Sequence, residues 1–288
     1  MEFDQAQLAA LGAAVSAGTL EAAARRLHVT PSAVSQRIKA LETQVGRVLL
    51  IRSKPVRATA SGQVLVRLAL QMQAVAQEAT AELTDEHDGQ GLRIPLAVNA
   101  DSLATWFLPA LVDAGPGLFF DLHCSDEQGT AELLREGAVM AAVTAAARPV
   151  PGCAVHRLGR MRYRPRARAA FAAQWFPDGV TPAALARAPV VCFDQRDQLQ
   201  DTYLRRHNRK PLNPPRHHVP ASTEFATAIR LGLGWGMVPD LQTGEELVEL
   251  DPNSKVDVLL HWQQWRLPSP TLELVSAAVT RAAANALR

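Results

Sequence analysis

Five polar residues within a span of eight near the N-terminus could make specific contacts with nucleic acid: Ser32, Ser35, Gln36, Arg37 and Lys39. On a helix these side chains would lie on the exposed first turns. In the major groove of DNA, glutamine can pair with adenine and arginine with guanine. Hydroxyl groups and a helix N-terminus suit phosphate oxygens. The cluster therefore predicts a DNA-reading helix; the alternative is an ordinary helical hairpin with a polar face.

Caps and apolar spacing predict the elements that position this cluster. A first helix with apolar residues over 8–15 is ended by Gly18, and Thr19 is a suitable cap for a second helix. Thr30 and Pro31 are typical of the first positions of a third helix. The apolar stripe of that third helix consists of Val34, Ile38, Leu41 and Val45. The pattern is that of a helix-turn-helix.

The charge of the chain is unevenly distributed. Between Thr19 and Arg67 there are nine Lys or Arg residues and two Asp or Glu residues, a net charge of +7. Because the whole chain carries +2, the remainder carries −5. A basic module on an acidic body is typical of a nucleic-acid binder. A basic run alone is often only a solvated surface, so the charge supports the motif without replacing it.

The residues after the third helix predict a wing of two short strands. Val48–Ile51 is a strand-like apolar run, and a basic turn containing a proline leads from it to Ala58. Arg52, Lys54 and Arg57 would lie along the DNA backbone or in the minor groove.

An apolar stripe between Ser61 and Leu83 predicts a long linker helix capped by Ser61, followed by a polar hinge over Asp85–Gly91. Such a stripe favours a second copy of the chain, as a homodimer or homotetramer. Two-fold symmetry would place two recognition helices on a palindromic operator in double-stranded DNA. The alternative is a helix that packs only on its own domain.

From residue 92 onward, short apolar runs alternate with helical segments, which predicts an α/β fold with mostly parallel sheets. The basic segment Arg157–Arg168 is interpreted as a crossover between two subdomains, and 241–247 as a helix. The expected domains are a DNA-binding domain (1–60), a linker helix and hinge (61–88) and an effector domain (89–288). Its first subdomain takes residues 89–160 and 266–288, and its second takes residues 161–265.

A polar turn follows the first strand of this domain and contains Asn99, Asp101, Ser102 and Thr105. Ligands of open α/β sheets bind beyond the carboxyl ends of strands, and a helix N-terminus favours an anion. The hydroxyl groups of Ser102 and Thr105 would suit a carboxylate. A helix cap at Asp101 that needs no ligand explains the pattern equally well.

Two runs of residues resemble the LysR-type transcriptional regulators. They are AAARRLHVTPSAVSQRIKALE, from Ala22 to Glu42, and the wing pattern R-x-x-x-x-R-A-T-x-x-G, from Arg52 to Gly62. The resemblance implies that Thr30 on the recognition helix and Thr59 in the wing also contact DNA. A third run, AVNADSLATWFLPAL from Ala97, is similar to the ArgP or LysG branch of that family, which controls lysine and arginine export.

The resemblance implies a periplasmic-binding-protein-like effector domain whose two subdomains enclose a pocket for lysine or arginine. Such a ligand needs donors for its carboxylate and acids for its cationic end. Ser102, Thr105 and Thr144 are the candidate donors, and Ser222 could contact the ligand from the second subdomain. The candidate acids are Asp126, Glu127 and Asp194, each of which could instead be a solvated loop carboxylate.

Other classes of function find little support. The N-terminus lacks a signal-peptide pattern and no long stretch is free of charges, so a cytoplasmic protein without membrane contact is expected. The spacing of the three cysteines and of His217–His218 indicates no metal site, and no cofactor is expected. No nucleophile elbow is present, so no catalytic residues are predicted and the chain is not expected to be an enzyme. RNA polymerase is a further expected partner. The alternative function is an architectural or origin DNA-binding protein without a physiological ligand.

Overall fold

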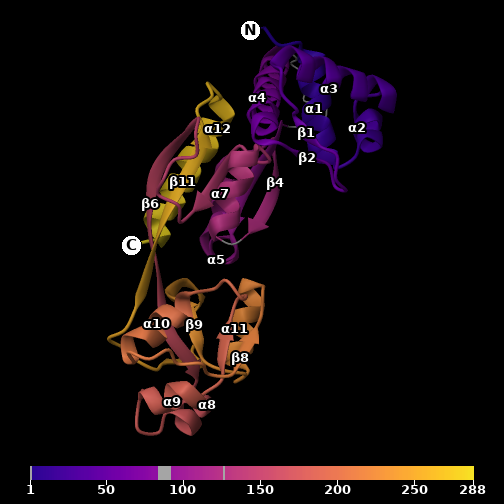
Figure 1. Cartoon of the computed structure of the whole chain (residues 1–288). Helices are drawn as coiled ribbons and strands as arrows, with labels where there is room; N and C mark the ends of the chain where they lie inside the picture. Colours follow the sequence, from indigo (N-terminus) through magenta and orange to yellow (C-terminus); the bar gives the residue numbers. More distant parts are fainter. Residues whose placement is uncertain (1, 84–91, 126) are drawn as a thin grey trace. The chain divides into compact units, whose positions relative to one another are not determined.

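The computed structural model describes residues 2–83, 92–125 and 127–288 and divides the chain into two compact units, whose elements are labelled in Figure 1. The first unit comprises Met1–Val98, Gly115–Val155 and Gln263–Leu274. The second unit comprises Asn99–Ala114, His156–Trp262 and Val275–Arg288. Within the described ranges, no helix combines the length and hydrophobicity needed to span a membrane.

The N-terminal module contains three helices: α1 (Gln5–Ala17), α2 (Leu20–Arg26) and α3 (Pro31–Val45). The side chains of Asp4, Thr19 and Thr30 cap them, each accepting a backbone N–H bond of 2.9 to 3.2 Å. Gly18 and Gly46 adopt left-handed conformations, with φ of 71° and 69°, directly after α1 and α3. The predicted helix-turn-helix and its caps are confirmed.

The wing consists of β1 (Leu50–Ile51) and β2 (Arg57–Ala58), which pair antiparallel with Ile51 opposite Arg57. Glu42 of α3 fixes this hairpin, because its Oε1 accepts from the backbone N–H of Leu49 at 2.8 Å. The wing is therefore attached directly to α3.

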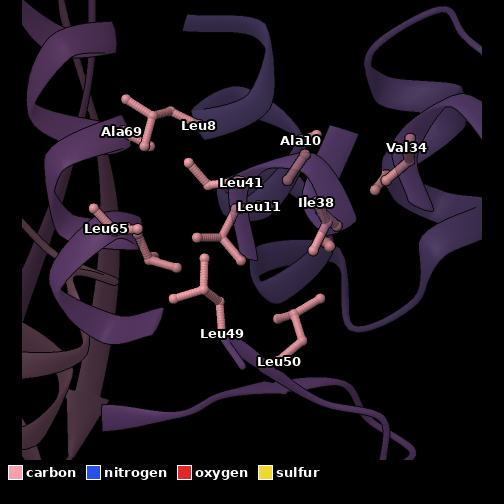
Figure 2. Packing of buried hydrophobic residues seen from close by; sticks show 14 of the residues in the cluster. Leu8, Ala10, Leu11, Val34, Ile38, Leu41, Leu49, Leu50, Leu65 and Ala69 are labelled. Carbon is pink, nitrogen blue, oxygen red and sulfur yellow. The ribbon is translucent and has the colours of Figure 1, made fainter. Parts of the chain in front are cut away.

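One apolar core holds the module together, and it includes the linker helix α4 (Ala60–Leu83). Figure 2 shows leucines of α1, α3, β1 and α4 meeting in this core. The fully or almost fully buried members include Leu8, Leu11, Leu41, Leu49 and Leu65. Because α4 contributes to this core, the start of the linker helix is part of the DNA-binding module.

The cap of α4 differs from the prediction. Thr59 Oγ1 accepts from the N–H of Gly62 at 3.0 Å, so Thr59 and not Ser61 caps the helix. The reason is that α4 begins at Ala60, two residues earlier than a cap at Ser61 predicts, which places Ser61 inside its first turn.

Gly62 offers a direct test of this packing. A Cβ at Gly62 would overlap the backbone carbonyl oxygen of Leu49 and would lie 3.3 Å from the Cβ of Ala58. We expect Gly62→Ala to lower the free energy of unfolding of the module by about 1–3 kcal/mol, because a backbone oxygen cannot move aside as a flexible side chain can. Urea unfolding followed by circular dichroism measures this change in the free energy of unfolding.

Gly12→Ala is the matched control for this measurement. Its Cβ would meet only the Cβ of Ala69, at an ordinary 3.5 Å, and alanine favours the helix. This variant should keep or slightly raise stability. Equal destabilisation by the two substitutions would contradict the role assigned to the contact between Gly62 and Leu49.

Further along its length, α4 packs against α7 (Glu127–Glu136) within the first unit. Arg67 Nη1 of α4 donates to the carbonyl oxygen of Pro151 at 3.0 Å. Gly137, just after α7, approaches so closely that a Cβ there would lie 3.1 Å from the Cα of Arg67. The linker helix thus contacts both the DNA-binding module and part of the effector domain. The predicted hinge, Asp85–Gly91, lies outside the described residues.

The remaining strands of the first unit are β3 (Leu92–Asn99), β4 (Leu118–Ser125) and β5 (Ala141–Thr144). The strand β3 lies between β5 and β4 and pairs parallel with β5, Leu96 opposite Ala141. Its carboxyl end leads into the polar turn at Asn99.

The second unit is built on two long strands, β6 (Cys153–Arg168) and β11 (Val256–Trp265). The antiparallel partners of β6 include β9 (Gly236–Pro239) and β10 (Leu247–Glu249), while β7 (Val190–Cys192) and β8 (Arg216–His218) form a separate parallel pair. The helical segments are α5 (Ala100–Ser102), η1 (Leu103–Phe107), α6 (Leu108–Asp113), α8 (Ala169–Trp175), α9 (Pro182–Arg187), α10 (Leu199–His207), α11 (Ser222–Arg230), η2 (Asp240–Gln242) and α12 (Pro270–Ala286). The strands β6 and β11 and the helix α12 each contribute residues to both units.

The predicted α/β class is confirmed, with three corrections. The sheets are mixed and not mostly parallel, because β6 pairs antiparallel with both β9 and β10. The segment Arg157–Arg168 is most of strand β6 and not a crossover connection. Residues 241–247 form a helical turn followed by the start of β10, because Val248 pairs with Ala167 of β6 and so draws the segment into the sheet.

Candidate DNA interface and effector site

Helix α3 separates an apolar face from a polar one. Val34, Ile38 and Leu41 are buried in the module core. On the polar side, Ser32, Gln36 and Lys39 are exposed and Ser35 and Arg37 are half-buried. Four of these five follow the i, i+3, i+4, i+7 spacing of one helix face, and Arg37 lies beside it. The structure therefore brings the predicted DNA-reading residues together on one surface.

The wing adds cationic side chains to the module. Arg52, Lys54 and Arg57 are all exposed. In the described part of the chain, none of these three, nor Arg37 or Lys39, takes part in an ion pair. Their charges are thus available to phosphate groups. Thr59, by contrast, uses its hydroxyl locally, since it donates to the carbonyl oxygen of Val48 at 2.8 Å and also caps α4.

Strand β3 ends at Asn99, the first residue of the second unit, and the helical stretch that follows is not regular. Between α5 and α6 the five residues Leu103–Phe107 form a π-helical segment, η1. Phe107 of this segment is buried and packs against Trp262, with ring centroids 6.4 Å apart. Such distortions inside helices occur frequently at functional sites. The irregular stretch carries Asp101, Ser102 and Thr105.

Asp101 is the centre of a polar network within the second unit. Its Oδ2 accepts from the Tyr163 hydroxyl at 2.7 Å, and its Oδ1 accepts from Ser222 Oγ at 2.5 Å. Gln242 Nε2 donates in turn to Ser222 Oγ at 2.9 Å. The structure thus joins the predicted residues Asp101 and Ser222. It adds Tyr163 and Gln242, which no sequence pattern singled out.

Buried polar atoms beside this network have no hydrogen-bond partner among the described residues. They are Asn99 Oδ1, Ser102 Oγ and Gln242 Oε1. Ser102 is completely buried, and Asn99 is only 4% exposed. A buried polar atom without a partner costs free energy, so such atoms mark places where a ligand or ordered water completes the bonding.

Thr105 and Asp194 use their polar groups locally. Thr105 Oγ1 donates to the carbonyl oxygen of Asp101 at 2.6 Å, one turn back along the helix. Asp194 Oδ1 accepts from the N–H groups of Arg196 and Asp197, at 2.7 and 3.0 Å, and so closes its own turn. These bonds account for both side chains without a ligand.

The acid Asp197 in that turn lies within electrostatic reach of Asp101. Burial raises the pKa of Asp197, and the charge of Asp101 raises it further, against the lowering effect of backbone bonds from Phe193 and Leu199. Asp101 thus has a second acid within electrostatic reach, and two neighbouring acids favour a cationic ligand group.

The other predicted effector residues belong to the first unit. Thr144 is buried at the end of β5, and its hydroxyl accepts from the N–H of Ala146 at 3.1 Å. Asp126 lies outside the described residues, as does the side chain of Glu127.

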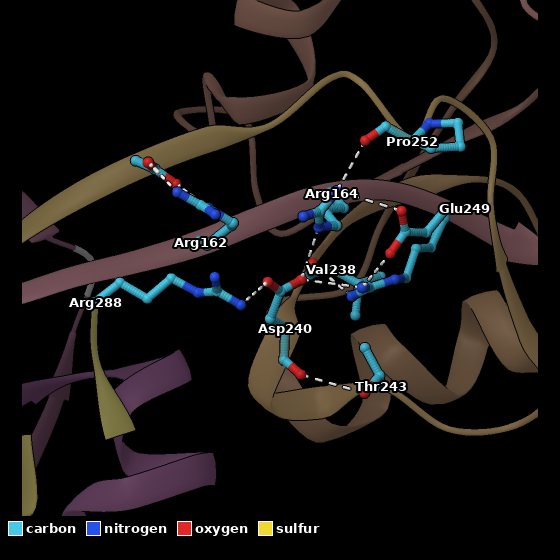
Figure 3. A network of polar contacts seen from close by, with 10 residues as sticks. Arg162, Arg164, Val238, Asp240, Thr243, Glu249, Pro252 and Arg288 are labelled. Atoms are coloured by element: carbon cyan, nitrogen blue, oxygen red, sulfur yellow. Dashed lines mark hydrogen bonds and ion pairs between the residues drawn. The ribbon is translucent and has the colours of Figure 1, made fainter. Parts of the chain in front are cut away.

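An arginine ladder supports the network from the other face of β6. Arg162, Arg164 and Arg166 alternate with Tyr163 and Pro165, so their side chains leave the strand on the face opposite Tyr163. Two arginines of this ladder hold Asp240, with Arg164 Nε at 3.3 Å and Arg166 Nη2 at 3.0 Å. Figure 3 shows Arg164 beside Asp240. Asp240 begins the turn η2 that carries Gln242. One strand thus fixes both Tyr163 and the turn of Gln242.

Two of the three cysteines, Cys153 and Cys192, are buried. Burial raises the pKa of Cys153 and of Cys192 to about 11, so both are protonated thiols at neutral pH. In residues 2–83, 92–125 and 127–288, no three His, Cys, Asp or Glu side chains are grouped as metal ligands.

The winged helix-turn-helix and the α/β domain that follows it in the sequence define the class of protein as a transcription regulator with an effector-type domain. Residues 5–63 match the model described as "Bacterial regulatory helix-turn-helix protein, lysR family", and residues 87–284 match the "LysR substrate binding domain". The chain belongs to the LysR family.

Relatives and solved structures agree with this assignment. The chain is 46% identical to the HTH-type transcriptional regulator LysG of Mycobacterium tuberculosis, over 99% of this chain and 95% of that protein. The crystal structure of ArgP from Mycobacterium tuberculosis is 45% identical, covers 100% of this chain and 99% of its own, and superposes with a TM-score of 0.91. Full-length LysG from Corynebacterium glutamicum with bound effector Arg is 37% identical, with coverages of 99% and 100% and a TM-score of 0.82. The predicted family and architecture are confirmed.

Proposed function

We propose that this chain is a cytoplasmic, sequence-specific transcription regulator whose activity is set by lysine or arginine and which controls the gene of an amino-acid exporter. The observation that carries the amino-acid role is the acidic, acceptor-rich network at Asp101, next to the unpartnered atoms of Asn99 and Ser102. A relative with bound effector Arg, and relatives called lysine export transcriptional regulatory proteins, support the same ligand class. The chain acts as a regulator and not as an enzyme.

The residue roles follow from the chemistry of the network. Asp101 would accept hydrogen bonds from the cationic end of the effector, and Ser102 and Asn99 would complete the buried polar contacts. Thr105 and Ser222 support the site by holding the helix and the Asp101 carboxylate. The sequence pattern adds four further candidate contacts to the effector: Thr144, Asp126, Glu127 and Asp194.

DNA binding would use two copies of the chain. Val64, Met72 and Val75 of α4 are exposed apolar residues, as a homodimer or homotetramer interface requires. A symmetric assembly would place two α3 helices in successive major grooves of a palindromic operator. Thr30, the polar face of α3 and the wing residues Arg52, Lys54, Arg57 and Thr59 would contact the DNA. RNA polymerase is the proposed further partner at the promoter.

A thermal-shift titration of the full chain against the twenty amino acids tests the effector role. A ligand that binds only the folded form stabilises it by about 2.7 kcal/mol at one hundred times its Kd. We expect the melting temperature to rise with lysine and arginine and to stay constant with leucine and glutamate. A flat response to all twenty would remove the effector role and favour the ligand-free architectural alternative.

A further inference from the structure

We propose that Gln242 is a specificity-determining residue that makes the Asp101 site prefer a guanidinium group to an ammonium group, and hence arginine to lysine. The inference rests on the proposed function, since it takes the Asp101 network to be the place where the effector's cationic end binds. Gln242 lies 141 positions after Asp101 in the chain, and it reaches the site through Ser222.

Hydrogen counting fixes the orientation of the Gln242 amide. The Ser222 hydroxyl has one hydrogen, which it donates to Asp101 Oδ1 at 2.5 Å, so toward Gln242 it can only accept. The amide must therefore present its NH₂ group to Ser222, as observed at 2.9 Å. Its carbonyl oxygen Oε1 is then left as an acceptor, and it is buried without a partner among the described residues.

The site offers more acceptors than an ammonium group has hydrogens. A carboxylate has about four lone-pair positions, and at Asp101 the Tyr163 and Ser222 hydroxyls occupy one on each oxygen. One position per oxygen remains, and Asn99 Oδ1 and Gln242 Oε1 add two more acceptors. Guanidinium has five N–H donors in a planar fork, whereas ammonium has three. Lysine would leave at least one of these four acceptor positions without a donor, and arginine need not.

The charge balance of the site also favours a cation of this kind. Within the described residues no salt bridge neutralises Asp101, and its charge acts on a second acid, Asp197. Guanidinium is more weakly hydrated than ammonium, so it loses less on entering a buried site.

The turn that carries Gln242 is anchored to strand β6. The turn starts at Asp240, which Arg164 and Arg166 hold from strand β6. The same strand carries Tyr163, which holds Asp101. Acceptors that are fixed relative to one another favour a ligand group whose donors are fixed as well.

The experiment is isothermal titration of the full chain with L-arginine, L-lysine and L-citrulline. Citrulline replaces the guanidinium by a neutral urea group of similar shape. For the unaltered chain we expect arginine to bind about tenfold more tightly than lysine, and at least about tenfold more tightly than citrulline. In Gln242→Met the new side chain is similar in size but lacks the amide. This variant should lower the affinity for arginine about tenfold and the affinity for lysine less than about threefold.

Thr243→Val is the matched control. If Gln242→Met is poorly folded, Gln242→Ala replaces it as the test variant. Thr243 lies directly after the same turn, is exposed, and bonds the carbonyl oxygen of Asp240 at 3.2 Å (Figure 3). Its substitution should leave the ratio of arginine to lysine affinity unchanged. Circular dichroism melting curves identify variants that have lost their fold.

The outcomes separate this inference from the function on which it rests. Equal losses for both amino acids in Gln242→Met would mean that Asp101 holds the α-ammonium group, and the inference would be wrong. An unchanged affinity ratio, or citrulline binding as tightly as arginine, would also overturn it. If the unaltered chain binds neither lysine nor arginine, the proposed effector class itself is wrong.

Discussion

The Asp101→Asn variant is expected to bind lysine and arginine about 100-fold more weakly than the unaltered chain, with its affinity for DNA in the absence of amino acid unchanged. Hydrogen bonds to a charged group contribute about 1.5–3 kcal/mol, and asparagine removes the charge while keeping the shape. Tyr163 and Ser222 can still contact the amide, so the network should keep its fold. Isothermal titration measures the affinity for each amino acid, and fluorescence anisotropy measures the affinity for DNA.

Asp113→Asn is the matched control for this variant. Asp113 is an exposed acid at the end of α6, in the same helical stretch as Asp101. Its loss changes the net charge by the same amount but should leave effector affinity within about a factor of two, because exposed charges are screened by solvent. Equal weakening by the two variants would indicate a general field effect and not a contact. Unchanged binding by Asp101→Asn would remove Asp101 from the site.

The DNA-binding module could be predicted from the sequence because its signals are local. Thr19 and Thr30 each cap a helix three residues before the N–H they accept, and Gly18 follows directly after the helix it ends. Apolar residues three and four apart then define the buried face of α3. Each of these contacts joins residues within one or two helical turns of each other, so it can be predicted from neighbouring residues in the sequence.

The effector network could be predicted only in part because its contacts are distant in sequence. Asp101 meets Tyr163 and Ser222 across separations of 62 and 121 residues. Local patterns found Asp101 at the end of a strand, but no periodicity connects it to Gln242. The same limit explains why residues 241–247 were expected to be helical: Leu247 pairs with Arg168 of β6, which lies far away in the chain.

Asp194 shows a second limit of sequence reasoning. Its position after a strand made it a candidate for the cationic end of the effector, yet its carboxylate accepts two backbone N–H groups of its own turn. Aspartate at a strand end has two common uses, a turn cap and a ligand contact, and composition cannot separate them. In the structure Asp194 closes its own turn, whereas Asp101 accepts hydrogen bonds from Tyr163 and Ser222, which belong to other elements.

The second large effect is expected on DNA binding when either of two arginines of the DNA-binding module is replaced. The two replacements should affect operator and random-sequence DNA differently. Arg37 lies beside the reading face of α3, whereas Arg57 lies on the wing. Arg37→Ala should weaken binding to a selected operator by about 10- to 100-fold and binding to random-sequence DNA much less, because a base contact contributes about 1–3 kcal/mol of discrimination. Arg57→Ala should weaken both, because a phosphate contact is independent of sequence.

Salt dependence distinguishes the two roles further. Fluorescence anisotropy with both duplexes at several salt concentrations gives the slope of log affinity against log salt. Removing one phosphate contact should lower the magnitude of this slope by about 0.9, so we expect that change for Arg57→Ala on both DNAs. Arg281→Ala, an exposed cation of α12 in the second unit, should alter neither the affinity nor the slope. Identical losses for the Arg37 and Arg57 variants on both duplexes would contradict the division between a base-reading helix and a backbone-binding wing.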